Sequence, residues 1–260
     1  MNPIERQMVE LLAKGREMHG VVSVKAEFEA EGTRIDELLR LVDIARCAGL
    51  KLTVKIGGCE AIRDLLEAKQ IGVQYLVAPM VETPYAALKF VAAKNLVYAE
   101  EEQIDTDFLF NIETITAFEN RKELINSRVQ TDGVVFGRVD FAGSLGFDRS
   151  RLNSQEITDY ILEISHLCKN ENKQLVMGGG VSFESLEAIQ SVTAVRLDRF
   201  ETRKVVFDAN IAVKADLESG IKNAVLFELL WLQNKQNYYA GIAREDAQRI
   251  MMLEKRVTEI

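Results

Sequence analysis

The stretch Val21–Arg34, "VVSVKAEFEAEGTR", begins like a buried strand and then carries charges at alternate positions. Successive side chains of an extended chain point to opposite faces, so Lys25, Glu27 and Glu29 share one face. The opposite face is apolar, with Val22, Val24, Ala26 and Phe28. A half-exposed antiparallel strand with its charges in water would show the same pattern. Other segments of the sequence are therefore needed to distinguish a solvent-exposed face from a functional one.

Short β-rich runs alternate with amphipathic helical stretches along the chain. The helical patterns "RIDELLRLVDIARCAG" and "CEAIRDLLEAKQIG" both end at glycine, as expected for helix C-termini. The predicted strands are Val21–Glu29, Leu50–Gly58, Gln74–Glu82, Asn95–Glu101, Phe108–Thr114, Gly133–Phe141, Gln174–Gly180 and Ala194–Glu201. Eight such repeats indicate an α/β protein with a (β/α)8 TIM barrel, preceded by a lead-in helix.

The chain has 260 residues, of which 47% are hydrophobic, and no Ser/Gly-rich linker, so we predict a single domain over residues 1–260. A C-terminal helical tail, about residues 221–260, exceeds what a barrel needs. Its apolar residues, including Trp231, Leu253 and Val257, would be exposed on a monomer. This favours a homo-oligomer, from dimer to hexamer, although a tail packed on its own barrel remains the alternative.

The net charge of −8 argues against general binding of nucleic acid or anionic membranes. The N-terminal 20 residues are amphipathic and not a hydrophobic signal, and no apolar run is long enough to span a bilayer. We therefore predict a cytoplasmic protein with small-molecule partners, no nucleic acid and no membrane. The three cysteines are widely separated and form no CxxC pair.

In a parallel barrel the carboxyl ends of the strands form the mouth of the active site, so the charges after Val21 would line the lumen toward that mouth. Three other predicted strands also carry a pair of polar residues on one face near the carboxyl end: Thr53 with Lys55, Asn111 with Glu113, and Arg138 with Asp140. Buried charges need partners, and these strands supply them for one another. The pattern predicts a polar reaction centre.

Glu113 and Asp140 end the fifth and sixth predicted strands, which are neighbours in a barrel. Two carboxylates with open positions suit a hard divalent cation, Mg²⁺ or alternatively Mn²⁺ or Co²⁺. Zinc is disfavoured because His19 and His166 lie on predicted helices. A glycosidase-type acid/base pair is the alternative for these acids, and the scarcity of aromatic residues argues against it.

Three segments, "APMVETPYAA", "FNIETITAFEN" and "DGVVFGRVDFAGSLG", resemble the HpcH/HpaI aldolase and citrate lyase family of phosphoenolpyruvate/pyruvate-binding barrels. The resemblance runs from the first strand to about the sixth helix. It implies a metal-dependent barrel that adds pyruvate enolate to an aldehyde, or reverses that reaction. It further implies metal binding by Glu113 and Asp140, and substrate-carboxylate binding by the backbone of Gly137, Arg138, Val139 and Asp140.

The chain also departs from the family pattern. Lys55 stands where relatives carry an arginine, and Arg138 where they commonly carry proline. Where relatives carry a Glu-His pair, this chain has Glu29 and Ala30, so the usual base is missing. Proton transfer would then fall to Glu29 first, or to Glu27, Lys25 or metal-bound water. Lys55 and Arg138 would balance the anionic substrate, although lysine lacks the bidentate fork of arginine.

Taken together, the sequence predicts a class II, divalent-metal-dependent carbon-carbon lyase acting on pyruvate or a related 2-oxo acid and an aldehyde. Alternatives are citrate-type condensation with an acyl thioester, or a barrel that binds a phosphorylated metabolite without catalysis. A Schiff base on Lys25 is disfavoured because the neighbouring Glu27 favours a charged ammonium.

Two further stretches leave alternatives open. The glycines of Gly178–Gly180 suit either an anion site or a tight strand-helix turn. The basic residues of "RLDRFETRKV", including Arg203 and Lys204, would either recognise a phosphorylated or carboxylated acceptor or be solvated at the rim of the barrel.

Overall fold

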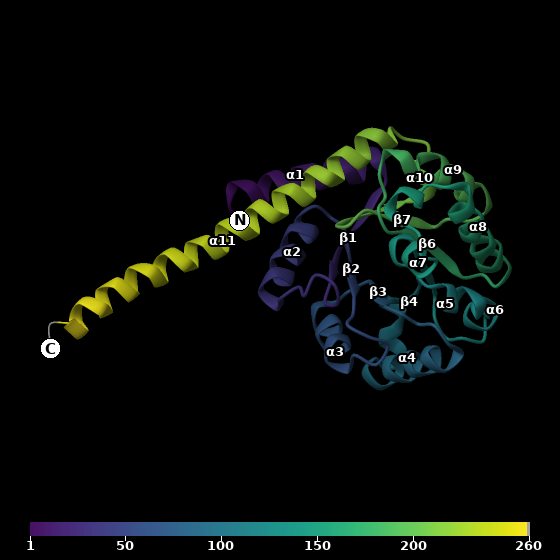
Figure 1. Ribbon diagram of the computed structural model, residues 1–260, viewed down its shortest axis with the longest axis horizontal. Helices are drawn as coiled ribbons and strands as arrows, with labels where there is room; N and C mark the ends of the chain where they lie inside the picture. Colours follow the sequence, from purple (N-terminus) through teal and green to yellow (C-terminus); the bar gives the residue numbers. More distant parts are fainter. Residues whose placement is uncertain (259–260) are drawn as a thin grey trace.

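The computed structural model describes residues 1–258 and confirms the predicted barrel (Figure 1). Eight strands close into a barrel in chain order. They are β1 (Val21–Glu27), β2 (Lys51–Lys55), β3 (Tyr75–Ala78), β4 (Asp107–Ile112), β5 (Gly133–Gly137), β6 (Gln174–Gly178), β7 (Arg199–Glu201) and β8 (Val205–Asp208). The main covering helices are α2 (Ile35–Cys47), α3 (Ile62–Ile71), α4 (Pro84–Val97), α8 (Gln155–Asn170) and α9 (Leu186–Val195).

Shorter helices lie in the connections between strands and helices. They are α5 (Ile115–Glu119), α6 (Arg121–Leu124), α7 (Arg138–Ser144) and α10 (Ala209–Ala212), with 3₁₀ turns η1 (Glu100–Asp105), η2 (Arg149–Arg151) and η3 (Phe183–Ser185). The positions of α5 and α7 matter for function, because each begins just after a strand at the carboxyl end of the barrel.

The predicted strand Asn95–Glu101 is wrong. Leu96 and Val97 complete α4, and the acidic run that follows forms η1. The strand numbering therefore shifts by one, and Glu113 and Asp140 follow β4 and β5, which are paired neighbours.

The closure of the barrel also differs from the prediction. Strands β1 to β7 pair in parallel, whereas β8 pairs antiparallel with both β7 and β1. Strand β8 lies in the segment expected to begin a helix, and only Arg199–Glu201 of the predicted last strand is extended. A hairpin turn, Thr202–Lys204, consequently replaces a strand-helix loop at the mouth of the barrel.

The barrel wall separates an apolar outer layer from a mixed lumen. Strand side chains such as Val24, Val54 and Phe110 are fully buried and belong to the large hydrophobic core. Inside, Val77, Leu109, Val135 and Val176 form a separate small cluster at alternating positions. Below them, the guanidinium of Arg199 lies 4.1 Å from the centre of the Tyr75 ring. The amino end of the lumen is thus filled, and the polar groups concentrate at the carboxyl end.

Two helices at the ends of the chain pack against each other beside the barrel (Figure 1). Helix α1 (Pro3–His19) confirms the lead-in helix, and Asn2 and Glu5 form its capping box. Helix α11 (Leu217–Thr258) has 42 residues, about 63 Å at 1.5 Å per residue. Its first half is buried along one face, and from Ala240 to Thr258 almost every residue is exposed. Residues 259 and 260 of the predicted tail lie outside the described residues.

Within residues 1–258, no helix is long and apolar enough to cross a bilayer. The predicted cytoplasmic location stays a prediction.

Candidate active site

The charged side chains predicted for the lumen meet at the carboxyl end of the barrel. Lys25 and Glu27 come from β1, Lys55 from the end of β2, and Glu113 follows β4 directly. Glu201, the last residue of β7, joins them. Lys25, Lys55, Glu113 and Glu201 are buried, with 8% or less of their surface exposed. The charged face of the Val21–Arg34 stretch is therefore a partnered interior site and not a solvated strand face.

Glu113 is held in place by three different elements. Its Oε1 accepts a hydrogen bond of 3.0 Å from the backbone N–H of Met80, which follows β3. Its Oε2 accepts a hydrogen bond from the side-chain amide of Asn111, two residues earlier. Gly137 leaves the necessary space, since a Cβ there would lie 2.9 Å from Glu113 Cβ. The carboxylate is therefore oriented before any ligand arrives.

Asp140 lies in the first turn of α7, on the exposed side of the mouth. Burial and the neighbouring negative charge of Glu113 raise the pKa of the Asp140 carboxyl, and Lys55 offsets this only in part. Among the described residues it has no hydrogen-bond or ion-pair partner. Strand β5 ends at Gly137, so the prediction that Asp140 and Arg138 share a strand face is wrong.

Lys55 bridges two carboxylates. Its Nζ lies 2.8 Å from Glu29 Oε2 and 3.4 Å from Glu113 Oε2. Burial alone would lower the pKa of Lys55, but Glu113 and Glu29 together raise it. The ammonium therefore stays charged at neutral pH and links the residue proposed for proton transfer to the residue proposed for metal binding.

Lys25 forms the second buried ion-pair group. Its Nζ lies 2.9 Å from Glu27 Oε1 and also donates to Glu201 Oε1. Burial opposes the charge, but Glu201 and Glu27 hold the pKa of Lys25 above its ordinary value. An amine that stays protonated at neutral pH is a poor nucleophile, and the raised pKa argues further against a Schiff base on Lys25.

The sequence analysis did not predict Glu201 as a site residue, because the strand that carries it, β7, is only three residues long. Its position two residues after Arg199, on the same face of the strand, was the pattern that could have identified it. Gly178 on β6 makes room for it, since a Cβ there would lie 2.8 Å from Glu201 Oε1.

Arg138 does not point toward the charged cluster as predicted. It is fully buried, and its guanidinium donates to Gly178 O at 3.3 Å, Asn153 Oδ1 at 3.0 Å and Ser185 Oγ at 3.1 Å. Because none of these partners is a carboxylate, burial lowers the pKa of Arg138 to about 10. The side chain fixes the loops around α7, and contact with substrate through the Arg138 backbone stays a prediction.

The glycines at the end of β6 allow the following loop to pack closely on the start of α7. Gly179 has φ of +81°, and a Cβ there would lie 2.7 Å from the backbone nitrogen of Val139. The loop therefore rests directly on the start of α7. The N–H of Ser182 is bonded to Ser185 Oγ, as in a tight turn.

The residues at the mouth suit a divalent cation. No group of three or more His, Cys, Asp or Glu side chains in residues 1–258 is arranged to share a metal ion. Two carboxylates at the mouth remain, Glu113 just after β4 and Asp140 in the first turn of α7, and within residues 1–258 Asp140 makes no ion pair. Asn111 Oδ1, beside Glu113, is buried and makes no hydrogen bond. Oxygen atoms of this kind are the preferred ligands of Mg²⁺ and Mn²⁺, with water and substrate completing the coordination.

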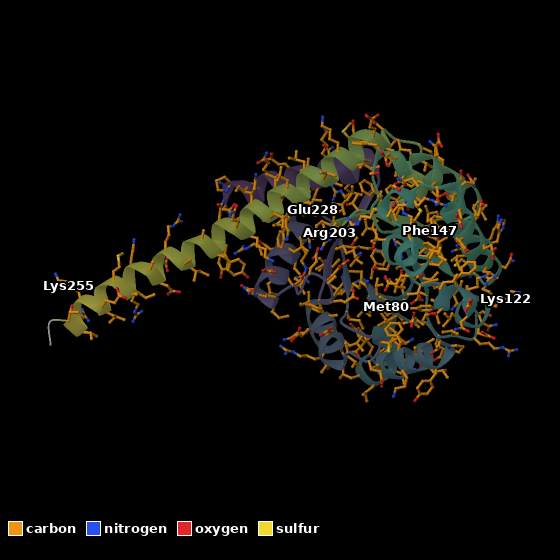
Figure 2. The ribbon with its side chains drawn as sticks, in the orientation of Figure 1. Met80, Lys122, Phe147, Arg203, Glu228 and Lys255 are labelled. Carbon is orange, nitrogen blue, oxygen red and sulfur yellow. The ribbon has the colours of Figure 1, made fainter. Side chains whose placement is uncertain are left out.

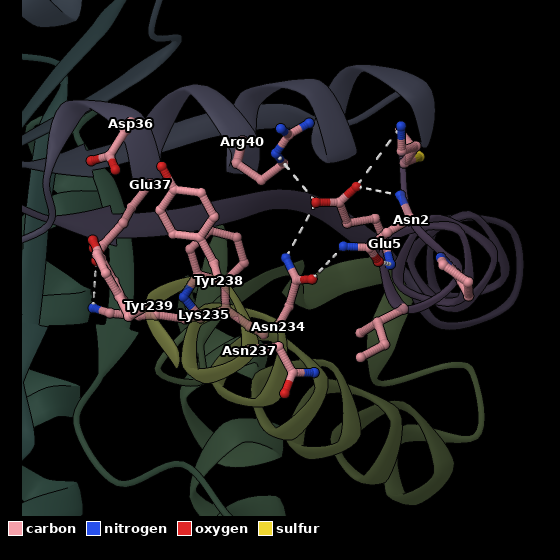
Figure 3. Close-up of a pocket in the computed structure, with 14 residues that line it drawn as sticks. Asn2, Glu5, Asp36, Glu37, Arg40, Asn234, Lys235, Asn237, Tyr238 and Tyr239 are labelled. Carbon is pink, nitrogen blue, oxygen red and sulfur yellow. Dashed lines mark hydrogen bonds and ion pairs between the residues drawn. The ribbon is translucent and has the colours of Figure 1, made fainter. Parts of the chain in front are cut away.

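A separate cavity of about 690 Å³ lies outside the barrel, where α1, α2 and α11 meet (Figure 3). Two of its carboxylates are paired: Glu5 with Arg40 at 3.2 Å and Glu37 with Lys235 at 2.9 Å. Figure 3 shows that Lys235, through Glu37, and Asn234, through hydrogen bonds with Asn2 and Glu5, attach α11 to α2 and α1 before its exposed part begins. The cavity contains none of the residues at the mouth.

Comparison with known proteins identifies one family. A model of the HpcH/HpaI aldolase/citrate lyase family matches residues 18–177. No curated protein sequence matches the chain significantly.

Solved structures share the fold. An HpcH/HpaI aldolase from Desulfitobacterium hafniense DCB-2 is 15% identical, with a TM-score of 0.62 over 77% of this chain and 83% of that one. The citrate synthase SbnG is 16% identical, with a TM-score of 0.59 over 88% and 90%. A protein of the HpcH/HpaI aldolase/citrate lyase family from Burkholderia cenocepacia J2315 is 15% identical, with a TM-score of 0.59 over 91% and 90%.

Proposed function

Because the chain belongs to the HpcH/HpaI aldolase/citrate lyase family, we propose that it is a divalent-metal-dependent carbon-carbon lyase that acts on pyruvate or a related 2-oxo acid and an aldehyde. The observation that carries this proposal is the pair Glu113 and Asp140, which follow the neighbouring strands β4 and β5 at the mouth, where burial and the charge of Glu113 raise the pKa of Asp140. Mg²⁺, or Mn²⁺ or Co²⁺ in its place, would be the cofactor.

The charge balance of the mouth supports a cation. Four cationic side chains meet six carboxylates there: Lys25, Lys55, Arg203 and Lys204 against Glu27, Glu29, Glu31, Glu113, Asp140 and Glu201. Neighbouring negative charges repel one another, so a surplus of two negative charges favours a site that binds a divalent ion.

Glu113, Asp140 and the oxygen of Asn111 would hold the ion. When bound, it would polarise the ketone and stabilise the negative charge of an enolate. Lys55 adds a fixed positive charge beside the same oxygens, which favours the developing negative charge on the substrate. The start of α7, at Gly137–Asp140, would receive the substrate carboxylate through its backbone.

Glu29 is the side chain that we assign to proton transfer. It lies at the mouth, about a quarter exposed, with its Oε2 next to Lys55 Nζ. In the synthetic direction it takes a proton from the methyl group of pyruvate. The resulting C3 carbanion forms the new carbon-carbon bond to the aldehyde carbon, and the aldehyde oxygen takes up a proton. In cleavage the same bond breaks and the proton returns to C3.

Exchange of the pyruvate methyl protons tests this proposal. In deuterium oxide with Mg²⁺, NMR should show loss of the methyl signal with the wild-type protein. Glu113→Gln should slow the exchange at least ~100-fold, the usual scale for losing a major electrostatic contribution. Glu119→Gln, at an exposed position on α5, is the matched control and should leave the rate unchanged. Substrate binding without exchange under any metal would instead support the non-catalytic alternative.

A citrate-type condensation is a second candidate, favoured by the structural similarity to the citrate synthase SbnG. In that case the carbon next to the thioester carbonyl would lose a proton and add to the ketone carbon of the 2-oxo acid, the ketone oxygen would take up a proton, and water would cleave the thioester to a carboxylate and a free thiol. Release of free thiol from an acyl thioester that depends on an added 2-oxo acid would distinguish it from aldol chemistry.

A homo-oligomer, from dimer to hexamer, is also part of the proposal. The exposed part of α11 carries Ile250, Leu253 and Val257 at helical spacing, with Val257 73% exposed. An apolar stripe of this kind favours contact with another copy. Light scattering should show that Ile250→Glu with Leu253→Glu lowers the mass of the assembly. The same double change at the exposed Leu88 and Leu96 of α4 should not.

A further inference from the structure

Another cavity, of about 670 Å³, lies at the amino end of the barrel, opposite the mouth. Its wall is formed by the end of α4, by η1, by the loop of residues 126–132 and by Lys173, which directly precedes β6. Figure 2 shows Met80, Phe147 and Arg203 around the mouth, and none of these residues lines the cavity. The cavity is therefore separate from the candidate active site.

Two buried lysines belong to the wall of this cavity. Lys94 and Lys173 have only 6% and 7% of their surface exposed. Lys94 Nζ donates to Gln130 O at 2.8 Å. Lys173 Nζ donates to Val129 O at 2.7 Å and to Thr131 O. Both ammonium groups therefore lie against the same loop, which forms one side of the cavity.

Neither ammonium group has a carboxylate in contact with it. Within residues 1–258 Lys94 and Lys173 form no ion pair, and the loop atoms that they contact are neutral carbonyl oxygens. Burial lowers the pKa of both lysines, although the charge of Asp132 opposes this at each of them. The charge of Lys173 lowers the pKa of Lys94 further. A buried positive charge without an ion-pair partner is costly, and a bound anion would reduce this cost.

The two ammonium groups also keep N–H groups for a ligand. Each ammonium has three N–H donors, and the bonds to the loop use one donor of Lys94 and two of Lys173. Two acids line the same cavity, Asp132 and Glu100, and both are exposed to solvent. Asp132 Oδ2 already accepts the N–H of Phe108 at 2.7 Å. The buried side of the cavity is thus the side that would attract an anion.

We infer that this cavity binds a phosphoryl group against Lys94 and Lys173, supplied either by inorganic phosphate or by a small phosphorylated metabolite. Lysine binds phosphate as a point charge through its N–H groups, and a phosphoryl group offers at least three strong acceptor oxygens. The volume of the cavity is typical of small-molecule sites and leaves room for the rest of a metabolite. The site lies away from the mouth, so its occupation does not depend on the reaction proposed there.

Calorimetric titration with inorganic phosphate in EDTA tests the site, because chelation prevents phosphate from binding through a cation at the mouth. The wild type should bind one phosphate per chain. Arg203→Gln, which removes a cation from the mouth, should bind phosphate equally well. Propyl phosphate identifies the source of the group: tighter binding than inorganic phosphate indicates a phosphorylated metabolite, and equal or weaker binding indicates free phosphate.

One lysine variant measures the contribution of the buried charge. Lys94→Gln should weaken phosphate binding at least ~10-fold, the scale of losing one hydrogen bond to a charged group. Lys222→Gln, at an exposed position on α11, removes the same charge elsewhere and should leave the affinity unchanged.

Two further variants change the charge of the cavity without touching the lysines. Asn95→Asp adds a negative charge and keeps the Oδ1 that accepts from Gln103 at 3.2 Å, so phosphate binding should weaken roughly threefold. Asp132→Asn removes a negative charge and keeps an acceptor for the N–H of Phe108, so binding should tighten by a similar factor.

A purely structural role of the lysines gives a different set of results. If they only fastened the loop, Lys94→Gln would lower the Tm, and Asn95→Asp and Asp132→Asn would leave the phosphate affinity unchanged. That result would overturn the inference. So would the absence of heat with phosphate and propyl phosphate in the wild type, loss of binding in Arg203→Gln, or binding of malonate as tight as that of phosphate.

Discussion

Gly137 and Glu113 lie so close that a single added methyl group would displace the carboxylate. A Cβ on Gly137 would be 2.9 Å from Glu113 Cβ and 2.8 Å from Oε2. Glu113 Cβ is fixed to its backbone and has little freedom to retreat. The absence of a side chain on β5 is therefore part of the site on β4.

Gly137→Ala should accordingly reduce metal binding without removing either proposed ligand. In the wild type, Mg²⁺ at 100 times its Kd should stabilise the protein by about 2.7 kcal/mol, or roughly 5–10 °C in Tm for a protein of this size. Most of this shift should vanish in Gly137→Ala. Gly143→Ala on α7, where the added methyl meets nothing within 4 Å, is the control and should keep the full shift.

Asp140→Asn should stabilise the metal-free protein. Burial and the negative charge of Glu113 both disfavour the charged carboxylate of Asp140, so replacing it with a neutral amide removes this cost at neutral pH. Urea unfolding in EDTA should give a higher midpoint for the variant than for the wild type, whereas added Mg²⁺ should stabilise only the wild type. A variant less stable than the wild type in EDTA would mean that Asp140 has a structural partner.

Lys25→Met should be strongly destabilising. It leaves the buried Glu201 and the partly buried Glu27 without their cation, and breaking one side of a buried ion pair costs about 3–5 kcal/mol. The double variant Lys25→Met with Glu201→Leu should recover part of that loss, as measured by urea unfolding.

With pyruvate and borohydride, the wild-type protein should gain no mass, because Lys25 remains protonated.

Glu27 should contribute stability that is lost in acid. Burial opposes its charge, but Lys25, Lys55 and Arg203 hold its pKa below the ordinary value of 4.5. The unfolded chain therefore binds the proton first as pH falls, and the stabilisation, complete above about 4.5, declines toward the lower folded pKa. Glu27→Gln should be less stable than wild type at pH 7, and this difference should shrink in unfolding experiments below pH 4.5. A constant difference would contradict the shift.

Much of the barrel could be predicted from the alternation of side-chain types along the strands, which remains visible in the sequence although these strands are buried. The lumen positions of Lys25, Lys55 and Glu113 could be predicted because each lies near the end of a strand with clear alternation. The Asn95–Glu101 strand was wrong because Leu96 and Val97 fit a helix face as well as a strand. Strand β8 was missed because its four residues follow a turn that no local pattern distinguishes from a helix start. Arg138 was misplaced because β5 ends at Gly137, four residues before the predicted end at Phe141, and α7 begins at Arg138, so the alternation of a strand no longer sets the direction of its side chain.

The most direct test of the account is calorimetric titration of Mn²⁺ or Mg²⁺ into the wild-type protein, Glu113→Gln, Asp140→Asn and the control Glu119→Gln. The account predicts one ion per chain for the wild type and Glu119→Gln, and binding at least tenfold weaker in the other two variants. Equal affinity in all four proteins, or no heat of binding in the wild type with either ion, would contradict it.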